Sequence, residues 1–169
     1  MTSTSGLASV AVGPPLHVVL VEPLIPQNTG TVGRLCVATG ARLHLVEPLG
    51  FDIDEKAVRR AGLDYWKNVD LHVHPSWEAC CAAIDVPAER FYLFSTHATR
   101  SYDDASYGHG DVVVFGKETG GLGRALLDEN DDQARTIPLF GPVRSLNLST
   151  TVGIVVYEAL RQMKMWSDE

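Results

Sequence analysis

Six short runs rich in β-branched and aromatic residues recur along the chain and alternate with segments of helical period. The runs are residues 16–21, 42–46, 71–74, 91–94, 111–115 and 134–137. Gly, Pro or acidic residues follow most of these runs, as is typical of buried strands. Because strands that alternate with helices form right-handed crossovers, the pattern predicts an α/β fold with a mostly parallel six-stranded sheet and helices on both faces.

The connecting segments carry helix signals. Helices are predicted from the turn at residues 26–30 to residue 39, over residues 54–61, 76–84 and 148–163, and near residues 124–127. Asn28 or Thr29 is the expected N-cap of the first helix and Ser76 that of the third, because their short polar side chains accept hydrogen bonds from free backbone N–H groups.

Composition places these elements in one soluble domain. The chain has 169 residues, of which 45% are hydrophobic and 21% charged, which is ordinary for a globular protein. Residues 1–15 carry no charge and no periodic pattern, so we expect a flexible N-terminal tail before a domain over residues 16–169. No apolar run reaches the roughly 18 residues of a membrane span, and no signal peptide is evident, so a cytoplasmic protein is expected.

Cysteines and histidines give little sign of a metal site. Cys36, Cys80 and Cys81 show no CxxC spacing, which argues against a disulfide framework or a zinc site. His72 and His74 share one face of a predicted strand, but no third ligand can be identified. A polar strand face is therefore the preferred interpretation, and no metal is predicted.

Three polar turns, at Asn28, Gly116 and Ser145, each follow a predicted strand. Ligands of parallel sheets bind outside the carboxyl ends of the strands, so these turns are expected to meet at one site. The loop over residues 137–151 is the richest of them, since it contains breakers and capping residues and leads into a helix that is apolar on one side. An ordinary strand-to-helix connection is the alternative for this loop.

Familiar nucleotide and hydrolase motifs are absent. Glu118 follows Lys117 where a P-loop requires Ser or Thr, and Gly110 lies one residue too early for its first glycine. The run from Gly121 to Leu126 ends in Leu where a dinucleotide fingerprint ends in Gly. No Gly-x-Ser-x-Gly elbow occurs. The residue patterns alone therefore indicate a ligand-binding α/β domain.

A basic segment with two aromatic residues has two interpretations. Lys56, Arg59 and Arg60 precede Tyr65 and Trp66, and together they could grip a phosphate and stack on a base. A solvated helix face beside two core aromatics explains the same residues and is slightly favoured. The net charge of -7 argues against general nucleic-acid binding, so any such contact must be local.

Three segments resemble the three motifs of SPOUT-class RNA 2'-O-methyltransferases. They are EPLIPQNTG at residues 22–30 with Arg34, FGKETGGL at residues 115–122, and IPLFGPVRSLNLS at residues 137–149. Within this class, RRAGLDY at residues 59–65 is similar to the small single-domain tRNA enzymes that modify cytidine or uridine at the wobble position. The resemblance covers nearly all of residues 16–165.

The resemblance implies a C-terminal trefoil knot (the SPOUT or α/β-knot fold), an S-adenosylmethionine pocket formed by the knot loops, and a homodimer. The cofactor-binding residues that it implies are Phe94, Gly116, Glu118, Ile137, Ser145, Asn147 and Leu148. Such a pocket suits a ligand that carries a sulfonium cation and no phosphate, which agrees with the missing P-loop.

The same resemblance assigns catalysis to Arg34, with Asn28 orienting it or capping its helix and Tyr157 near the reactive centre. Arg34 is expected to reach the cofactor of the other subunit, fix the RNA phosphate and stabilise the developing alkoxide, because guanidinium is a poor base. General-base action is the minority view, and a solvated helix charge is the alternative. His97 and Gly120 stand where related enzymes often have lysine and arginine.

The expected activity is S-adenosylmethionine-dependent 2'-O-methylation of the tRNA wobble nucleotide, cytidine or uridine, with the anticodon stem-loop as the partner. Two alternatives remain, namely a ribosomal RNA 2'-O-methyltransferase and a non-catalytic protein of the same fold that binds cofactor and RNA. Intact Arg34, Asn28, Glu118 and Ser145 favour an enzyme.

Overall fold

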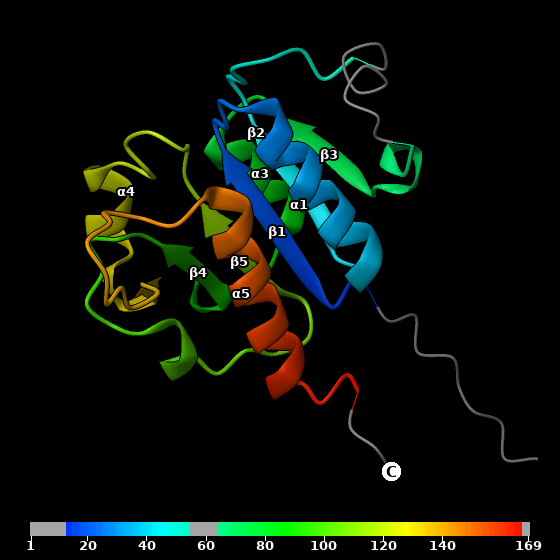
Figure 1. The fold of residues 1–169 in the computed structure, drawn as a ribbon. Coiled ribbons are helices and arrows are strands. Elements are labelled where there is room, and N and C mark those ends of the chain that lie inside the picture. Colours follow the sequence, from blue (N-terminus) through cyan, green and yellow to red (C-terminus); the bar gives the residue numbers. More distant parts are fainter. Residues whose placement is uncertain (1–12, 55–63, 167–169) are drawn as a thin grey trace, which may run out of the picture.

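The computed structural model describes residues 13–54 and 64–166 (Figure 1). Residues 1–12 of the expected tail lie outside this part of the chain, and so do Lys56, Arg59 and Arg60 of the expected helix over residues 54–61. Among the described residues, no helix is both long and apolar enough to cross a membrane.

The strands form one parallel sheet of the predicted kind. They are β1 (Leu16–Val21), β2 (Arg42–Val46), β3 (Leu71–His74), β4 (Phe91–Phe94), β5 (Asp111–Phe115) and β6 (Ala134–Arg135). Their order is β3-β2-β1-β5-β4-β6, and every neighbouring pair is parallel. All carboxyl ends therefore lie at the same edge of the sheet.

Five strands begin and end at the predicted residues, whereas β6 is shorter than the expected 134–137. Its continuation leaves β4 and joins the loop after that strand. The N–H group of Thr136 donates to the carbonyl of Arg100 at 2.8 Å, and its carbonyl accepts from the N–H group of Tyr102 at 2.8 Å. Strand order and pairing do not define how the chain threads, so the trefoil knot stays a prediction.

Helices cover both faces of the sheet, as predicted. They are α1 (Pro26–Thr39), α3 (Trp77–Ile84), α4 (Arg124–Glu129) and α5 (Leu148–Gln162), with 3-10 turns η1 (Trp66–Asn68), η2 (Ala88–Arg90), η3 (Tyr102–Asp104) and η4 (Asp131–Gln133). In Figure 1, α1 and α5 lie on the same face of the sheet, and α3 lies behind β2. Leu126 and Leu127 of α4 pack against the core on the α3 side.

The expected N-cap of α1 is wrong. The helix begins at Pro26, and the residue before it, Ile25, makes no side-chain capping bond. Proline suits the first helical position because its fixed φ is helical and its missing N–H group has no intrahelical partner there. Asn28 and Thr29 lie inside the helix and are buried. Ser76, in contrast, caps α3 as predicted, since its Oγ accepts from the N–H group of Ala79 at 3.1 Å.

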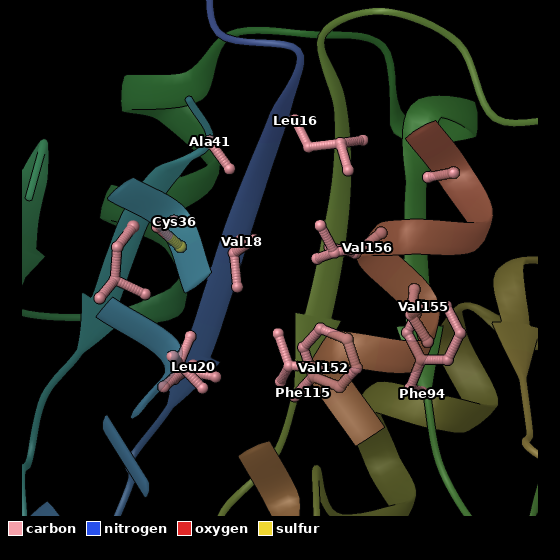
Figure 2. Packing of buried hydrophobic residues seen from close by; sticks show 14 of the residues in the cluster. Leu16, Val18, Leu20, Cys36, Ala41, Phe94, Phe115, Val152, Val155 and Val156 are labelled. Carbon is pink, nitrogen blue, oxygen red and sulfur yellow. The ribbon is translucent and has the colours of Figure 1, made fainter. Parts of the chain in front are cut away.

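Alternate residues of the strands point into two different cores, which explains why the strand sequences are continuous apolar runs. The larger core contains Val18 and Leu20 of β1 under α1 and α5 (Figure 2). Valine side chains at residues 152, 155 and 156 of α5 are completely buried in it. The smaller core contains Val19 of β1 under α3. Because both faces of the sheet are covered, the central strands lie in the interior of the molecule.

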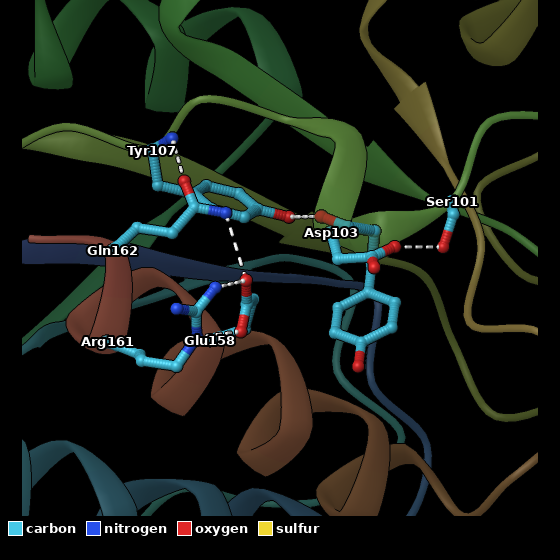
Figure 3. Close-up of polar contacts among 7 residues, drawn as sticks. Ser101, Asp103, Tyr107, Glu158, Arg161 and Gln162 are labelled. Carbon is cyan, nitrogen blue, oxygen red and sulfur yellow. Dashed lines mark hydrogen bonds and ion pairs between the residues drawn. The ribbon is translucent and has the colours of Figure 1, made fainter.

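The C-terminal end of α5 is tied to the loop before β5 (Figure 3). The N–H group of Tyr107 donates to Oε1 of Gln162 at 3.0 Å, and Nε2 of Gln162 donates to Oε1 of Glu158 at 3.0 Å. Arg161 donates to both carboxylate oxygens of Glu158 at 2.7 and 2.9 Å. The hydroxyl of Tyr107 donates to the carbonyl of Tyr102 at 2.6 Å. This helix end is therefore fixed by side chains as well as by its apolar stripe.

Replacing either of two mid-helix glycines by alanine should change the free energy of unfolding, with opposite signs at the two positions. A Cβ at Gly33 of α1 would lie 2.5 Å from Cζ3 of Trp66, whereas a Cβ at Gly153 of α5 meets nothing within 4 Å. We expect Gly33→Ala to lower the free energy of unfolding by about 1–3 kcal/mol through overpacking. Gly153→Ala should raise it by about 0.5–1 kcal/mol through helix propensity. Urea denaturation measures both, and equal effects of the two variants would contradict the packing of Trp66 on α1.

Candidate active site

A cavity of about 750 Å³ opens at the carboxyl edge of β1, β5, β4 and β6. The turns after β5 and β6 and the start of α1 form its walls. All seven residues expected at a cofactor pocket line it, namely Phe94, Gly116, Glu118, Ile137, Ser145, Asn147 and Leu148. The structure thus brings together residues from three distant segments, and their binding role stays a prediction.

The turn after β5 depends on the absence of a side chain at Gly116. A Cβ there would lie 2.1 Å from the carbonyl carbon of Gly121 and 2.3 Å from the backbone nitrogen of Leu122. Lys117 and Gly121 form an isolated antiparallel bridge that closes the turn. Gly120 and Gly121 have φ of 91° and 63°, which glycine adopts without steric cost. The turn is therefore a compact backbone loop beside the cavity.

The carboxylate of Glu118 joins this turn to the start of α1. Its Oε2 accepts from the N–H group of Leu24 at 2.7 Å, and its Oε1 accepts from the N–H group of Ile25 at 3.0 Å. Nδ2 of Asn28 donates to the same Oε1 at 3.3 Å. These donors precede or open α1, where backbone N–H groups have no helical partner. The turn after β5 and the first turn of α1 are thus held as one unit.

Asn28 extends the connection to the third turn. Its Oδ1 accepts from Nδ2 of Asn147 at 3.0 Å. Oδ1 of Asn147 accepts from the N–H groups of Ser149 and Thr150 at 2.9 and 3.3 Å, which caps α5. The structure therefore gives Asn147, rather than Asn28, a capping role. One chain of polar side chains links all three turns around the cavity.

The environment of Glu118 favours its ionised form. Partial burial alone raises the pKa of Glu118, but the hydrogen bonds from Leu24, Ile25 and Asn28 outweigh it, so the pKa lies below its ordinary value. A carboxylate that accepts several backbone N–H groups gains more from hydrogen bonding than it loses in hydration. Glu118 is therefore a negatively charged anchor at neutral pH.

The three residues expected in catalysis lie in different places. Asn28 lines the cavity and belongs to the polar chain just described. Arg34 and Tyr157 do not line the cavity of their own chain, and both are exposed. Arg34 lies over the ring of Tyr65, 5.7 Å from its centroid, while the hydroxyl of Tyr65 donates to the carbonyl of Gly30 at 2.7 Å. Tyr65 thus holds the guanidinium against the outer side of α1.

Other wall residues were not predicted individually from the sequence, although the loop after β4 could have been found from the carboxyl-edge rule. They are Ser95, Thr96, Ala98, Arg124, Leu127, Asp128, Asp131, Thr136, Leu139 and Arg144. His97 and Gly120, which depart from the resemblance, also line the cavity. Lys117, Arg124 and Arg144 provide cationic groups on the wall of the same cavity.

The cavity suits S-adenosylmethionine in size and donor set. Small-molecule sites are usually cavities of about 300–1,000 Å³ with apolar walls and a few polar groups. Phe94, Ile137 and Leu148 provide apolar surface on which an adenine ring could pack, whereas Asp128 and Asp131 place carboxylates on a wall that would meet a cationic ligand. No phosphate needs to be held, and the turn at Gly116 is closed by its own backbone bridge.

Comparison with known proteins agrees with this geometry. The chain matches the SpoU rRNA Methylase family over residues 15–157 and belongs to that family. The resemblance to RNA methyltransferases is therefore confirmed. The family's fold is the parallel α/β architecture found here, as the structural comparisons below show.

A protein of Burkholderia pseudomallei (strain 1106a) named tRNA (cytidine(34)-2'-O)-methyltransferase is 50% identical over 147 residues, which cover 86% of this chain and 94% of that protein. A structure solved in work on the 2-OH methylation of C/U34 on tRNA has a TM-score of 0.78 and 43% identity, covering 87% of this chain and 95% of that one. An AdoMet-bound rRNA methyltransferase from Sinorhizobium meliloti has a TM-score of 0.75 and 25% identity, covering 88% and 58%.

Glu118 should make stability depend on pH. Its folded pKa is lowered, so its contribution is present above the unfolded pKa of about 4.3 and is lost as the pH falls through the folded value. We expect Glu118→Gln to lower the free energy of unfolding by about 1–2 kcal/mol at pH 7. The loss should shrink as the pH is lowered from 6 to 3 in urea titrations.

Glu129→Gln is the matched control, because Glu129 is exposed at the end of α4. It should change stability little at any pH. A Glu118→Gln variant with the same pH profile as the wild type would contradict the anchoring role of the carboxylate.

Proposed function

We propose that this chain is an S-adenosylmethionine-dependent methyltransferase that methylates the ribose 2'-hydroxyl of the tRNA wobble nucleotide, cytidine or uridine. The observation that carries the proposal is the meeting of three distant turns around one cavity, joined through Glu118, Asn28 and Asn147. The 50% identity to a tRNA (cytidine(34)-2'-O)-methyltransferase over 147 residues supports the substrate. The proposed substrate would be met in the cytoplasm, and we propose that the protein acts there.

Residues of the three turns hold the cofactor in this proposal. Phe94, Ile137 and Leu148 pack on its apolar parts, while backbone groups at Gly116 and Ser145 contact its polar edges. When bound, S-adenosylmethionine supplies a methyl group on a positively charged sulfur. Glu118 and Asn147 act at a distance from the chemistry, because their hydrogen bonds fix the positions of the turns.

Arg34 acts on the RNA rather than on the cofactor of its own chain. It lies outside that cavity, and the ring of Tyr65 holds its guanidinium on the exposed side of α1. A guanidinium stays protonated in proteins, so it is suited to binding a phosphate and stabilising negative charge on the ribose oxygen. This position requires that Arg34 serve the cavity of a second subunit.

A homodimer through the outer sides of α1 and α5 would satisfy this requirement. These helices lie on the same face of the sheet and pack against each other (Figure 1). Val37 of α1 and Tyr157 of α5 are 37% and 49% exposed, and Trp166 beyond α5 is 55% exposed and lies 6.1 Å from Tyr157 between ring centroids. Aromatic residues that are exposed on a monomer are typical of interface cores. The interface would bring Arg34 and Tyr157 toward the partner cavity.

Arg34→Ala should strongly reduce methyl transfer to tRNA and leave S-adenosylmethionine affinity nearly unchanged. Loss of a charge that acts only in the transition state lowers kcat by about 100–1,000-fold. Arg42→Ala is the matched control, because Arg42 pairs with Asp70 at 2.7 Å and begins β2 at the opposite edge of the sheet. Calorimetric cofactor binding and labelled-methyl transfer measure the two effects separately.

Ser145→Trp gives the reciprocal variant, since a bulky side chain at the cavity wall should remove cofactor binding together with activity. Equal loss of binding and transfer in Arg34→Ala would instead place Arg34 in the cofactor site and refute its assignment to RNA.

The substrate is tested by transfer of labelled methyl to total tRNA and to ribosomal RNA, followed by nuclease mapping of the label. Ribose-methylated cytidine or uridine at the wobble position is expected. Label in ribosomal RNA alone would contradict the proposed tRNA substrate but would agree with the proposed methyl transfer. Cofactor binding without transfer to either RNA would identify a non-catalytic binding protein.

A further inference from the structure

Four histidines gather on the half of the sheet that lies away from the cavity. His17, His44, His72 and His74 come from β1, β2 and β3. In the parallel register His44 faces His72, and Val46 faces His74, so these side chains share one face. Val46 belongs to the core that α3 covers, which places the histidines on the α3 side. Three of them, His17, His44 and His74, are buried.

Hydrogen bonds connect the three buried rings. Nδ1 of His17 lies 2.9 Å from Nε2 of His44, and Nδ1 of His44 lies 2.9 Å from Nε2 of His74. Burial lowers the pKa of His44 to about 3, so the ring is neutral near pH 7. His72 differs from the others, because it is exposed and its Nε2 lies 2.8 Å from Oδ1 of Asp70.

A thiol from α3 completes a potential ligand set. Cys80 is 0% exposed, and one ligand atom from each of His44, His74 and Cys80 lies within 4.8 Å of the other two. In the sequence, His72 and His74 share one predicted strand, and no third ligand lies near them. The structure instead groups residues from β2, β3 and α3, which no local spacing would reveal.

We propose that His44, His74 and Cys80 form a Zn²⁺ site that is separate from the methyltransferase cavity. Two imidazole nitrogens and one thiolate are typical zinc ligands, and three protein ligands leave one position for water. Ligand atoms that share a zinc ion lie about 3.3–3.7 Å apart, given bond lengths of about 2.0–2.3 Å. The paired nitrogens at 2.9 Å must therefore separate slightly, while the sulfur already lies within 4.8 Å of both.

The proton balance of this site is simple. Zinc binding displaces the thiol proton of Cys80 to solvent, while each imidazole keeps one proton. His44 then coordinates through Nδ1 and carries its proton on Nε2, from which it donates to Nδ1 of His17 across the observed 2.9 Å. Metal-bound imidazoles usually donate their other N–H group to such an acceptor, which fixes the ring. His17 is thus a positioning residue of the site.

Metal binding is measured on full-length protein stripped with a chelator and dialysed against Zn²⁺, with Co²⁺ as a spectroscopic probe. We expect one zinc ion per chain and a thiolate-to-cobalt charge-transfer band. Cys80→Ser and His74→Gln should lose the band and the bound metal. Removing an outer partner of a ligand costs about 10–100-fold in affinity, so His17→Gln should fall in that range.

Matched controls come from the same elements. Cys81 follows Cys80 on α3 and is only partly buried, and His72 lies two residues before His74 on β3. Cys81→Ser and His72→Gln should bind zinc as the wild type does. Absence of stoichiometric zinc in the wild type, or an unchanged cobalt band in Cys80→Ser, would show that the histidines form only a hydrogen-bonded core chain. If Cys80→Ser fails to fold, the wild-type band and the Cys81→Ser control still decide the question.

Discussion

The carboxylate of Glu118 is the contact on which the cavity depends most. It accepts from the backbone of Leu24 and Ile25, which precede it by 94 and 93 residues. Asn28, which donates to Glu118, in turn accepts a hydrogen bond from Asn147, which lies 119 residues after it in the sequence. Turns have few intrinsic restraints of their own, so these few polar contacts set their mutual positions. The residues that shape the cavity are therefore largely different from the groups expected to touch the reacting ribose.

The parallel sheet separates two kinds of site on one scaffold. The cavity lies at the carboxyl edge near β1, β5, β4 and β6, whereas the histidine cluster lies on the faces of β1, β2 and β3 under α3. β1 contributes His17 to the cluster and leads to Ile25 and Asn28, which line the cavity. Its apolar residues are buried on both faces of the sheet, so a variant in this strand affects packing on both sides. Variants in the turns or in α3 are better suited to test either site alone.

The sequence predicted the sheet well because its evidence is local. Five strands are β-rich runs that end at turn residues, and their bounds were correct. The cavity walls at Phe94, Gly116 and Ser145 followed from the resemblance and the carboxyl-edge rule. The N-cap at Asn28 was wrong because the same amide accepts from Asn147, a contact that local spacing does not contain. The grouping of His44 with Cys80 was invisible for the same reason.

Helix α5 closes the larger core last along the chain. Its residues Val152, Val155 and Val156 are completely buried, and Asn147 and Gln162 tie its two ends to α1 and to the loop before β5. During synthesis, the sheet face beneath α5 stays uncovered until this helix has emerged, although all six strands precede it. Exposed apolar surface of that kind attracts other chains. A chain without α5 therefore exposes this face, and the cavity lacks the wall that Asn147 and Leu148 form at the start of the helix.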